Sequence, residues 1–362
     1  MEWFWLVAGV PLLVSGAFCA LSDGEISVSE VVVSTVLSAL IAVGVSELGR
    51  YGKTADVEVW NGRVTGKERA VVSCEHSYAC NCRQVCSGSG SNQTCWTHCD
   101  TCWEHSYDVS WMVNTTAGGD VEIGRIDRQG LGQPPRWTAV TVGEPASLEH
   151  GFTNYIKAVP ESLFAPGAIE GYGELPGYPR VHDYYRISRV IGGGALTSGW
   201  SGMLSEALEE RGGARQVNAI IVAVDSRREP GYADALRAAW LGGKKNDAVL
   251  VIGHDGSRIT WVRVFSWSKE SMFNIALRDA VTDIGTMDGA RIVDAIARAI
   301  DASWVRRPMA EFEYLASEIQ PPTWVLVVAL VLGGGIAAFM SMKFHELDLD
   351  GELWSMIRRM RG

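Results

Sequence analysis

Seven of the chain's eight cysteines lie in one short stretch, CEHSYACNCRQVCSGSGSNQTCWTHCDTC. The spacing is C-x5-C-x-C-x3-C-x8-C-x3-C-x2-C. In an oxidising compartment such cysteines form disulfides that cross-link a loop too small to bury a core, and an odd count leaves one thiol over. Alternatively, CxC, CxxxC and CxxC with interleaved histidines are donor sets for tetrahedral Zn²⁺, including Cys3His. The candidate disulfide or zinc residues are Cys74, Cys80, Cys82, Cys86, Cys95, Cys99 and Cys102.

The segments on either side of these cysteines predict two β-strands. ERAVVSCEHSY and CWEHSYDVSWMV are rich in β-branched and aromatic residues, so we expect them to pair as antiparallel strands with the cysteines in a long excursion at their tip. His76 and His105 belong to two copies of EHSY and are expected to be paired strand residues rather than ligands. The cysteines are therefore expected to hold a β-tip rigid for contact with something.

Three apolar runs indicate an integral membrane protein. They are Trp3–Leu21, Val31–Leu48 and Trp324–Met340, each close to the ~20 residues that cross a hydrocarbon core. The first run has no Lys or Arg before it and a poor cleavage site, so we expect a retained helix rather than a signal peptide. Only nine residues separate the first two runs, which predicts a helical hairpin. Small residues at i+4 spacing would let another helix approach the second one closely: Ser34, Ser38, Ala42 and Ser46.

The C-terminal tail suggests the orientation of these spans. Leu349, Leu353, Ile357 and Met360 recur at helical spacing beside three arginines, a pattern that suits an anionic cytoplasmic leaflet. By the positive-inside rule the tail is then cytoplasmic, and the region between the second and third spans lies outside. Four basic residues flank the spans on the side assigned to the outside, and they weaken the argument for this orientation: Arg50, Lys53, Arg306 and Arg307.

Beyond about Gly192 the pattern changes to alternating helices and strands. SGMLSEALEERGG predicts an amphipathic helix that stops at Gly212, and QVNAIIVAVD predicts a strand buried on both faces. A helix (GYADALRAAWLGG), two strands (DAVLVIG and RITWVRVFSW) and a long helix (MDGARIVDAIARAIDASW) follow. This order predicts an α/β sandwich in which Asp225 and Asp255 end two parallel strands.

Residues 195–302 resemble the TPM domain family, on the phrases SEALEERGGARQVNAIIVAVD and YADALRAAWLGGKKNDAVLVIG. Here Asn246-Asp247-Ala248 stands where the family usually has an Asn-Gly turn. The resemblance implies an extracytoplasmic domain beside a membrane span. Some members are cation-binding or weakly phosphatase-like, and others modulate a partner membrane protein.

The carboxyl ends of the two parallel strands are the place to look for a site. Asp225, His254 and Asp255 could hold Ca²⁺ or Mg²⁺ there, or act as acid and base, although Asp is also common at strand ends as a turn cap. IGGGALTSG, residues 191–199, follows no convincing strand and lacks a phosphate-binding Lys, so it predicts a linker. The chain contains no GxSxG, Walker or HExxH motif.

The sequence therefore predicts a mixed α/β and β protein with three transmembrane helices. Its expected parts are a helical hairpin (1–49), a cysteine-rich β-domain (50–159), a Pro- and Gly-rich connector (160–190), a TPM-like domain (191–305), a linker with the third span (306–342) and a basic amphipathic tail (343–362).

We expect a membrane-anchored, non-enzymatic interaction or assembly protein whose partner is another membrane protein or a second copy. The formal net charge of −10 and the lack of a basic stripe argue against nucleic acid. The alternatives are a weak divalent-cation-dependent phosphatase and a membrane-associated virion or envelope component. The sequence leaves the cofactor undetermined, and the candidates are Ca²⁺ or Mg²⁺ at the strand ends and Zn²⁺ if the cysteines are reduced.

Overall fold

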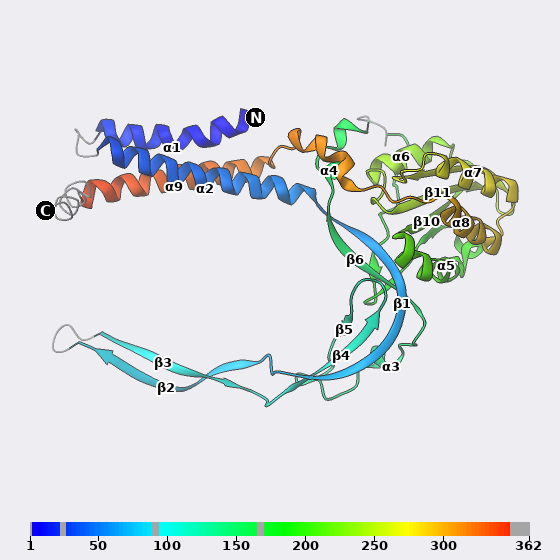
Figure 1. Ribbon diagram of the computed structural model, residues 1–362, viewed down its shortest axis with the longest axis horizontal. Helices are drawn as coiled ribbons and strands as arrows, with labels where there is room; N and C mark the ends of the chain where they lie inside the picture. The colour runs from blue at the N-terminus through cyan, green and yellow to red at the C-terminus, as the bar shows by residue number, and fades with distance from the viewer. Residues whose placement is uncertain (1, 22–26, 89–93, 165–169, 348–362) are drawn as a thin grey trace. The chain divides into compact units, whose positions relative to one another are not determined.

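The computed structural model describes residues 2–21, 27–88, 94–164 and 170–347 (Figure 1). The basic tail expected from Leu349 onward lies outside these residues. The described chain divides into two compact units: residues 1–56, 151–164 and 309–362 form the first, and residues 57–150 and 165–308 form the second.

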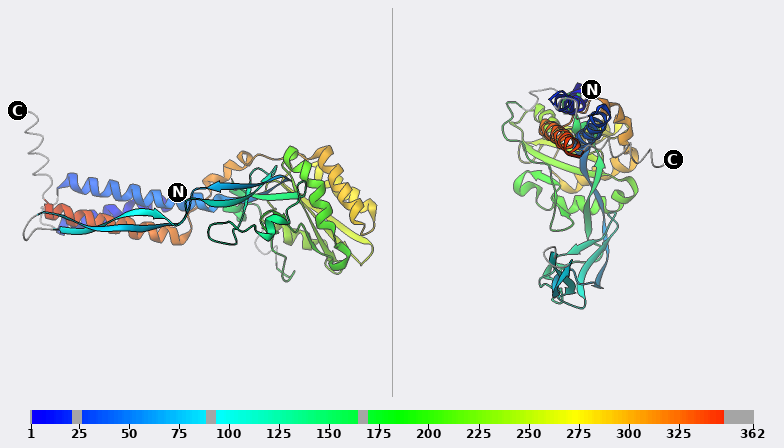
Figure 2. Two further views of the ribbon diagram at one scale, coloured as in Figure 1. Left: turned by 90° about the horizontal axis from the view of Figure 1, so that it is seen from below. Right: turned by 90° about the vertical axis from the view of Figure 1, so that its left-hand side faces the viewer.

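The first unit is built on three long apolar helices, seen end-on in Figure 2: α1 (Glu2–Leu21), α2 (Val28–Thr54) and α9 (Thr323–Leu347). All three are long and apolar enough to cross a membrane, as the sequence predicted. The second helix begins three residues before its apolar run because Ser27 caps it. The Ser27 side chain accepts from the Glu30 amide, and the Glu30 carboxylate accepts from the Ser27 amide.

The predicted small-residue face of α2 is buried in this bundle. Ser34, Ser38, Ala42 and Ser46 are all buried. The Ser34 and Ser15 hydroxyls lie 3.0 Å apart, and Ser34 donates to the Ala337 carbonyl at 3.2 Å. Small side chains therefore let the helix backbones approach closely enough for hydrogen bonds to cross the interface. Three short helices complete this unit: α4 (Tyr155–Ala158), η2 (Pro160–Ser162) and η4 (Met309–Ser317).

The second unit contains a four-stranded sheet of order β5-β4-β1-β6. Its strands are β1 (Ala55–Val72), β4 (Asp108–Thr115), β5 (Val121–Ile123) and β6 (Pro145–Thr153). β1 pairs antiparallel with β4, from Val72 opposite Asp108 to Val64 opposite Thr115. The predicted pairing of the segments that flank the cysteines is thereby confirmed.

Between β1 and β4 the chain runs out and back as β2 (Ser77–Ser87) and β3 (Thr94–Trp103). These strands pair antiparallel along their length, with a register shift between Cys80 and Arg83. Six of the seven clustered cysteines therefore lie on the two-stranded ribbon of β2 and β3, which we call the cysteine ribbon, and Cys74 precedes it. The short helix α3 (Pro135–Thr138) begins at Pro135, because at the first helical position the missing amide of proline costs nothing.

The α/β part has a sheet of order β12-β11-β10-β9. β10 (Asn218–Asp225) runs parallel to β11 (Asp247–His254), as predicted, and β12 (Ile259–Ser266) pairs antiparallel with β11. β9 (Val190–Gly192) pairs parallel with β10 inside the segment predicted to be a linker. That prediction was wrong at its start because three residues with a glycine carry too little pattern to indicate a strand. The short hairpin β7 (Val181–His182) and β8 (Arg186–Ile187) precedes it.

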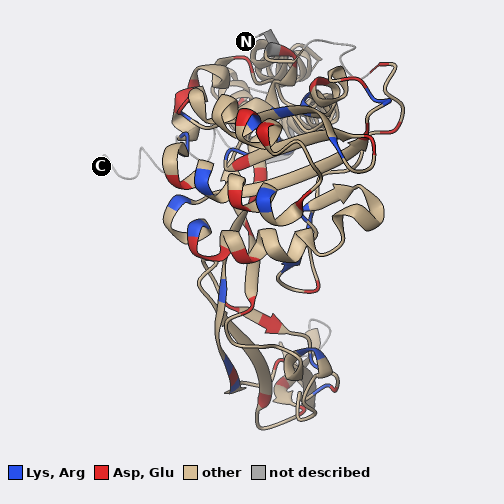
Figure 3. Cartoon of the chain, turned by 90° about the vertical axis from the view of Figure 1, so that its right-hand side faces the viewer, with Lys and Arg blue, Asp and Glu red and all other residues tan. Residues whose placement is uncertain are grey.

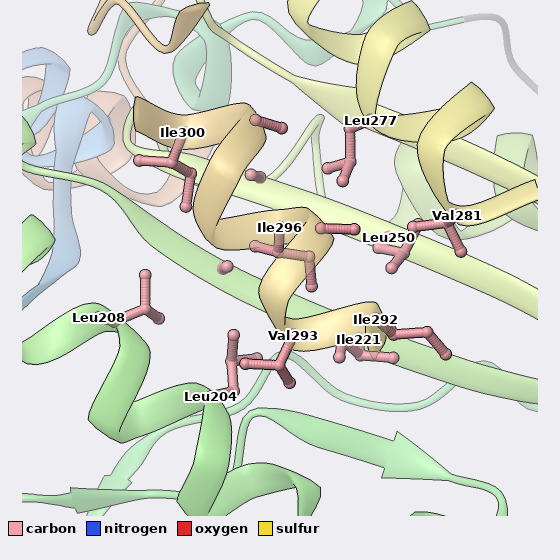
Figure 4. Packing of buried hydrophobic residues seen from close by; sticks show 14 of the residues in the cluster. Leu204, Leu208, Ile221, Leu250, Leu277, Val281, Ile292, Val293, Ile296 and Ile300 are labelled. Carbon is pink, nitrogen blue, oxygen red and sulfur yellow. The ribbon is translucent and has the colours of Figure 1, made fainter. Parts of the chain in front are cut away.

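Helices cover both faces of this sheet. On one face α5 (Trp200–Arg215), α7 (Met272–Ile284) and α8 (Gly289–Ser303) pack on Ile221 and Leu250 (Figure 4). On the other face α6 (Gly231–Ala239) packs on Val222 and Val249. The 3-10 helix η3 (Gly194–Thr197) follows β9. In Figure 3 acidic and basic segments are interspersed over these helices.

Helix α5 does not stop at Gly212, contrary to the prediction. It continues to Arg215 and is capped by Gln216 in the left-handed conformation. Gly212 instead lies against strand β1, where an added Cβ would come within 2.3 Å of the Asn61 Cβ. Its glycine is explained by close packing of a helix on a strand rather than by helix termination.

Candidate functional site

The cysteine ribbon is cross-linked along its length by three cysteine pairs at disulfide distance. They are Cys80–Cys102, Cys82–Cys99 and Cys86–Cys95, and Cys74 is left over. Three pairs with one remaining thiol is the outcome that the disulfide interpretation predicts. The three pairs favour the disulfide alternative over the zinc alternative for these six cysteines, because paired sulfurs offer no thiolate ligands.

The ribbon has almost no interior. None of the described residues of β2 and β3 is fully buried. Three aromatic side chains are about half exposed: Tyr78 at 51%, Trp96 at 49% and Trp103 at 55%. Since an isolated two-stranded ribbon is at best marginally stable in water, the cross-links replace the missing core.

At the base of the ribbon, three potential ligands converge, and we call them the basal cluster: Cys74, His105 and Asp108. Their ligand atoms all lie within 4.8 Å of one another. The Cys74 Sγ is 3.8 Å from His105 Nδ1, and His105 Nδ1 is 3.2 Å from Asp108 Oδ1. Both Cys74 and Asp108 are buried, and the His105 side chain is 25% exposed.

The local chain path explains this convergence. Cys74 lies just after β1 ends at Val72, and Asp108 is the first residue of β4. Because Val72 and Asp108 are register partners, the two chain ends that leave the sheet are side by side. His76 and His105 were expected to be strand residues, but both lie outside the strands. That expectation was wrong, and it concealed the cluster.

The Asp108 carboxylate is held from its other side. Its Oδ2 accepts from the Glu75 amide at 3.0 Å and from Arg125 Nη1 at 3.2 Å. The Glu75 hydrogen bond, with smaller effects from His105, Cys74 and Arg125, lowers the pKa of Asp108 below its ordinary value against the opposing effect of burial. Asp108 is therefore an anion at neutral pH.

This geometry does not match a cysteine–histidine–aspartate nucleophile. In such a triad the carboxylate orients one imidazole nitrogen while the other nitrogen accepts the nucleophile's proton. Here the thiol and the carboxylate both face Nδ1. The arrangement suits ligation of a cation better than proton relay.

The predicted strand-end site is partly assembled. Asp225 and His254 are register partners at the ends of β10 and β11, and Asp255 follows. The Asp225 carboxylate is bound by Arg227 at 2.9 Å, and this pairing lowers its pKa to about 2. The Asp255 carboxylate accepts from the Arg258 amide at 3.0 Å, and His254 Nδ1 accepts from the Gly256 amide at 3.1 Å. These bonds are those of turn caps, and cation binding at this edge stays a prediction.

A groove of about 540 Å³ lies at the same edge of the sheet. Asp225 and Tyr232 line it together with the backbone of Gly192, whereas His254 and Asp255 do not. Arg228 also borders the groove and stacks on the Tyr232 ring at 4.9 Å. Two of the three predicted cation ligands therefore lie outside the groove.

A buried polar network that the sequence did not reveal crosses the second unit. Arg189, 1% exposed, donates to the side-chain oxygens of Asn61 and Asn218. Asn218 in turn donates to Asp247 at 2.8 Å, as does the Tyr178 hydroxyl. Burial lowers the pKa of Arg189 to about 10 and raises that of Asp247 to about 6.

Comparison of the chain with protein-family models, with curated proteins and with solved structures finds no match.

Proposed function

We propose that this chain is a membrane-anchored, non-enzymatic interaction protein that uses the cysteine ribbon as its contact surface. The partner is a second polypeptide at the same membrane. The three apolar helices supply the anchor, and the ribbon supplies the recognition element.

One observation carries this proposal: the cysteine ribbon is cross-linked but encloses no core. Cross-links in a small element ordinarily compensate for a core that is too small to hold the fold. Here the folded remainder of the unit has its own buried clusters and carries none of the three cysteine pairs. The cross-links therefore make the ribbon rigid and do not hold the rest of the unit together. A rigid element binds with a smaller loss of conformational entropy.

The exposed aromatic residues are the proposed anchors of this contact. Trp and Tyr dominate binding energy at protein interfaces because each buries a large apolar area with few rotatable bonds. Trp96 lies opposite Val85 in the ribbon, which joins two apolar side chains across the strands. Tyr78 lies opposite Cys102, which is in phase with Trp96 along β3, so Tyr78 and Trp96 share one face of the ribbon.

The α/β part is proposed to be TPM-like and to lie outside the cytoplasm with the ribbon. Parallel strands β10 and β11 between two helical layers agree with the first statement. Three cysteine pairs at disulfide distance favour an oxidising compartment, in agreement with the second.

Site-specific photo-crosslinking in membranes tests the proposal. A photoreactive amino acid replaces Trp96 in the full chain, and Ile275, a 41% exposed apolar residue on α7, serves as the matched control position. We expect discrete adducts from position 96 and few from position 275. Mass spectrometry of the adducts separates a second copy of this chain from another protein.

Substitution of the second anchor completes the test. Tyr78→Ala should reduce adduct formation from position 96 at least tenfold, as expected for a loss of more than about 1.4 kcal/mol at an anchor residue. Equal yields from positions 96 and 275, or yields from position 96 that Tyr78→Ala leaves unchanged, would overturn the proposal.

A further inference from the structure

We infer that the basal cluster is a metal site that binds Zn²⁺ through Cys74 Sγ, His105 Nδ1 and Asp108 Oδ1. This site differs from the zinc alternative raised by the cysteine spacing, because it uses the one thiol that remains after the six ribbon cysteines pair. It is independent of the proposed function, since an interaction ribbon needs no metal.

The separations between the ligand atoms fit tetrahedral zinc. With metal–sulfur and metal–nitrogen bonds of ordinary length, tetrahedral ligands lie about 3.5 Å apart for sulfur and nitrogen and about 3.3 Å apart for nitrogen and oxygen. The corresponding distances in the basal cluster are 3.8 Å and 3.2 Å. The third pair, the Cys74 sulfur and the Asp108 carboxylate, lies within 4.8 Å, and side-chain adjustments that close this separation would bring the three atoms onto one ion.

The His105 ring presents the same nitrogen to both other ligands, while the Cys74 thiol donates to the His76 carbonyl at 3.6 Å when no ion is bound. One ring nitrogen, Nδ1, faces both the Cys74 sulfur and the Asp108 oxygen. A single N–H at that atom donates to one of them at a time. An ion at the centre would be bound by all three atoms at once.

The surroundings of the ligands are those of a supported metal site. Asp108 Oδ2 is occupied by the Glu75 amide and Arg125, so Oδ1 is the oxygen that faces the cluster. Hydrogen bonds of this kind to a ligating carboxylate fix its orientation. The positive charge of Arg125 is compensated by Glu75 at 3.1 Å and Glu122 at 3.8 Å.

The chemistry of the donors selects the metal. One thiolate, one imidazole and one carboxylate suit a borderline-soft ion such as Zn²⁺ and not Ca²⁺ or Mg²⁺, which take oxygen ligands. Because His105 is partly exposed, we assign the fourth position to water. Bound metal would join the two chain ends that enter and leave the ribbon, since Cys74 precedes β2 and His105 follows β3.

Cobalt titration of the full chain in detergent, untagged, metal-stripped and with its disulfides intact, tests this site. We expect one equivalent of Co²⁺ to bind with a sulfur-to-cobalt charge-transfer band, and Zn²⁺ to displace it. Cys74→Ser should abolish the band, and His105→Gln should weaken binding at least tenfold.

His76→Gln is the matched control, because His76 is the equivalent residue of the other EHSY copy and is not in the basal cluster. It should bind Co²⁺ as the wild type does. A band that persists in Cys74→Ser, no band in the wild type at millimolar Co²⁺, or equal losses in both histidine variants would each overturn the assignment. Should Cys74→Ser fail to fold by circular dichroism, the two histidine variants still decide.

Discussion

At the scale of single residues, the buried network around Arg189 and Asp247 concentrates charge where water is excluded. Asn218 lies between the two ions and bonds to both, so each charge is partly compensated through an amide rather than by direct contact. Removing one partner of such a network leaves the other buried and unsatisfied, which is more costly than the network is stabilising. The network also joins β1, through Asn61, to the α/β sheet.

The raised pKa of Asp247 makes the stability of the protein depend on pH. Burial raises this pKa from 3.8 to about 6, so the folded chain holds the proton more tightly than the unfolded chain. The stabilisation is fully present below pH ~4 and is lost as the pH rises through ~6, a difference of about 3 kcal/mol. We expect the melting temperature to fall over this range by more in the wild type than in Asp247→Asn.

Thermal denaturation of both proteins in detergent between pH 4 and pH 7 measures this difference. The difference between the wild-type and Asp247→Asn curves reports on Asp247. Carboxylates with lowered pKa values, such as Asp225 and Asp127, are present in both proteins, and their contribution is lost on acidification instead. Parallel pH curves for wild type and variant would contradict the prediction.

The residues whose roles the sequence did not reveal are ones with partners far away in the chain. Gly212 has the position expected of a helix stop. A glycine is required there because Asn61, which is far away in the chain, packs against it. Cys74 and His105 are separated by 31 positions and meet only because the ribbon returns to its base. A local sequence pattern does not show which distant residues come into contact. The EHSY repeat was the available signal, with Cys before the first copy and Asp after the second.

At the scale of elements, the cysteine ribbon and the α/β sheet are stabilised by different interactions. The central strands β10 and β11 are buried over nearly all their residues. The ribbon strands are exposed over nearly all of theirs and depend on three cross-links. The two elements should therefore respond differently to reduction.

Reduction should loosen the ribbon and leave the sheet intact. After treatment with a reductant, we expect amides of residues 77–103 to exchange rapidly with deuterium, while those of β10 and β11 stay protected. Hydrogen exchange with mass spectrometry gives both readings in one experiment. Cys86→Ser/Cys95→Ser should reproduce the effect near the tip, whereas Cys19→Ser, outside the three pairs, should not. Unchanged protection in the reduced ribbon would refute this account.

Elements with a strong repeating pattern were predicted, and elements without one were not. The apolar spans, the parallel pair β10–β11 and helix α8 follow from continuous or periodic apolar residues. Strand β9 has three residues, α3 has four, and neither is long enough to establish a period. Helix α7 was not predicted, although Phe273, Leu277 and Val281 recur at helical spacing on its buried face.

At the scale of the whole molecule, the order of the spans ties the two ends of the soluble region to one side of a membrane. If α2 and α9 both cross, residues 55–322 share one compartment, and the C-terminus lies in the other. The side that holds these residues decides whether the ribbon cysteines meet oxidising or reducing conditions. The orientation of the spans therefore determines whether the ribbon cysteines are oxidised or reduced.

Fusion of reporters after Gly362 measures the orientation of the spans. We expect a fluorescent protein at this position to be fluorescent and an export-dependent phosphatase to be inactive, because the basic C-terminal tail favours the cytoplasm. The same reporters inserted after Gly143, in the region between α2 and α9, should give the reverse pattern. An active phosphatase at the C-terminus would place the cysteines in the cytoplasm and contradict the disulfide interpretation there.

The three cysteine pairs are nested, and this nesting has a consequence for how the chain matures. The pairs span 9, 17 and 22 positions, and none crosses another. Closing a short loop costs less entropy than closing a long one, so Cys86–Cys95 is expected to close first. Each closed pair then shortens the free chain for the next. Oxidation can proceed from the tip towards the base, one pair after another. Cys74 lies beyond the last of these pairs.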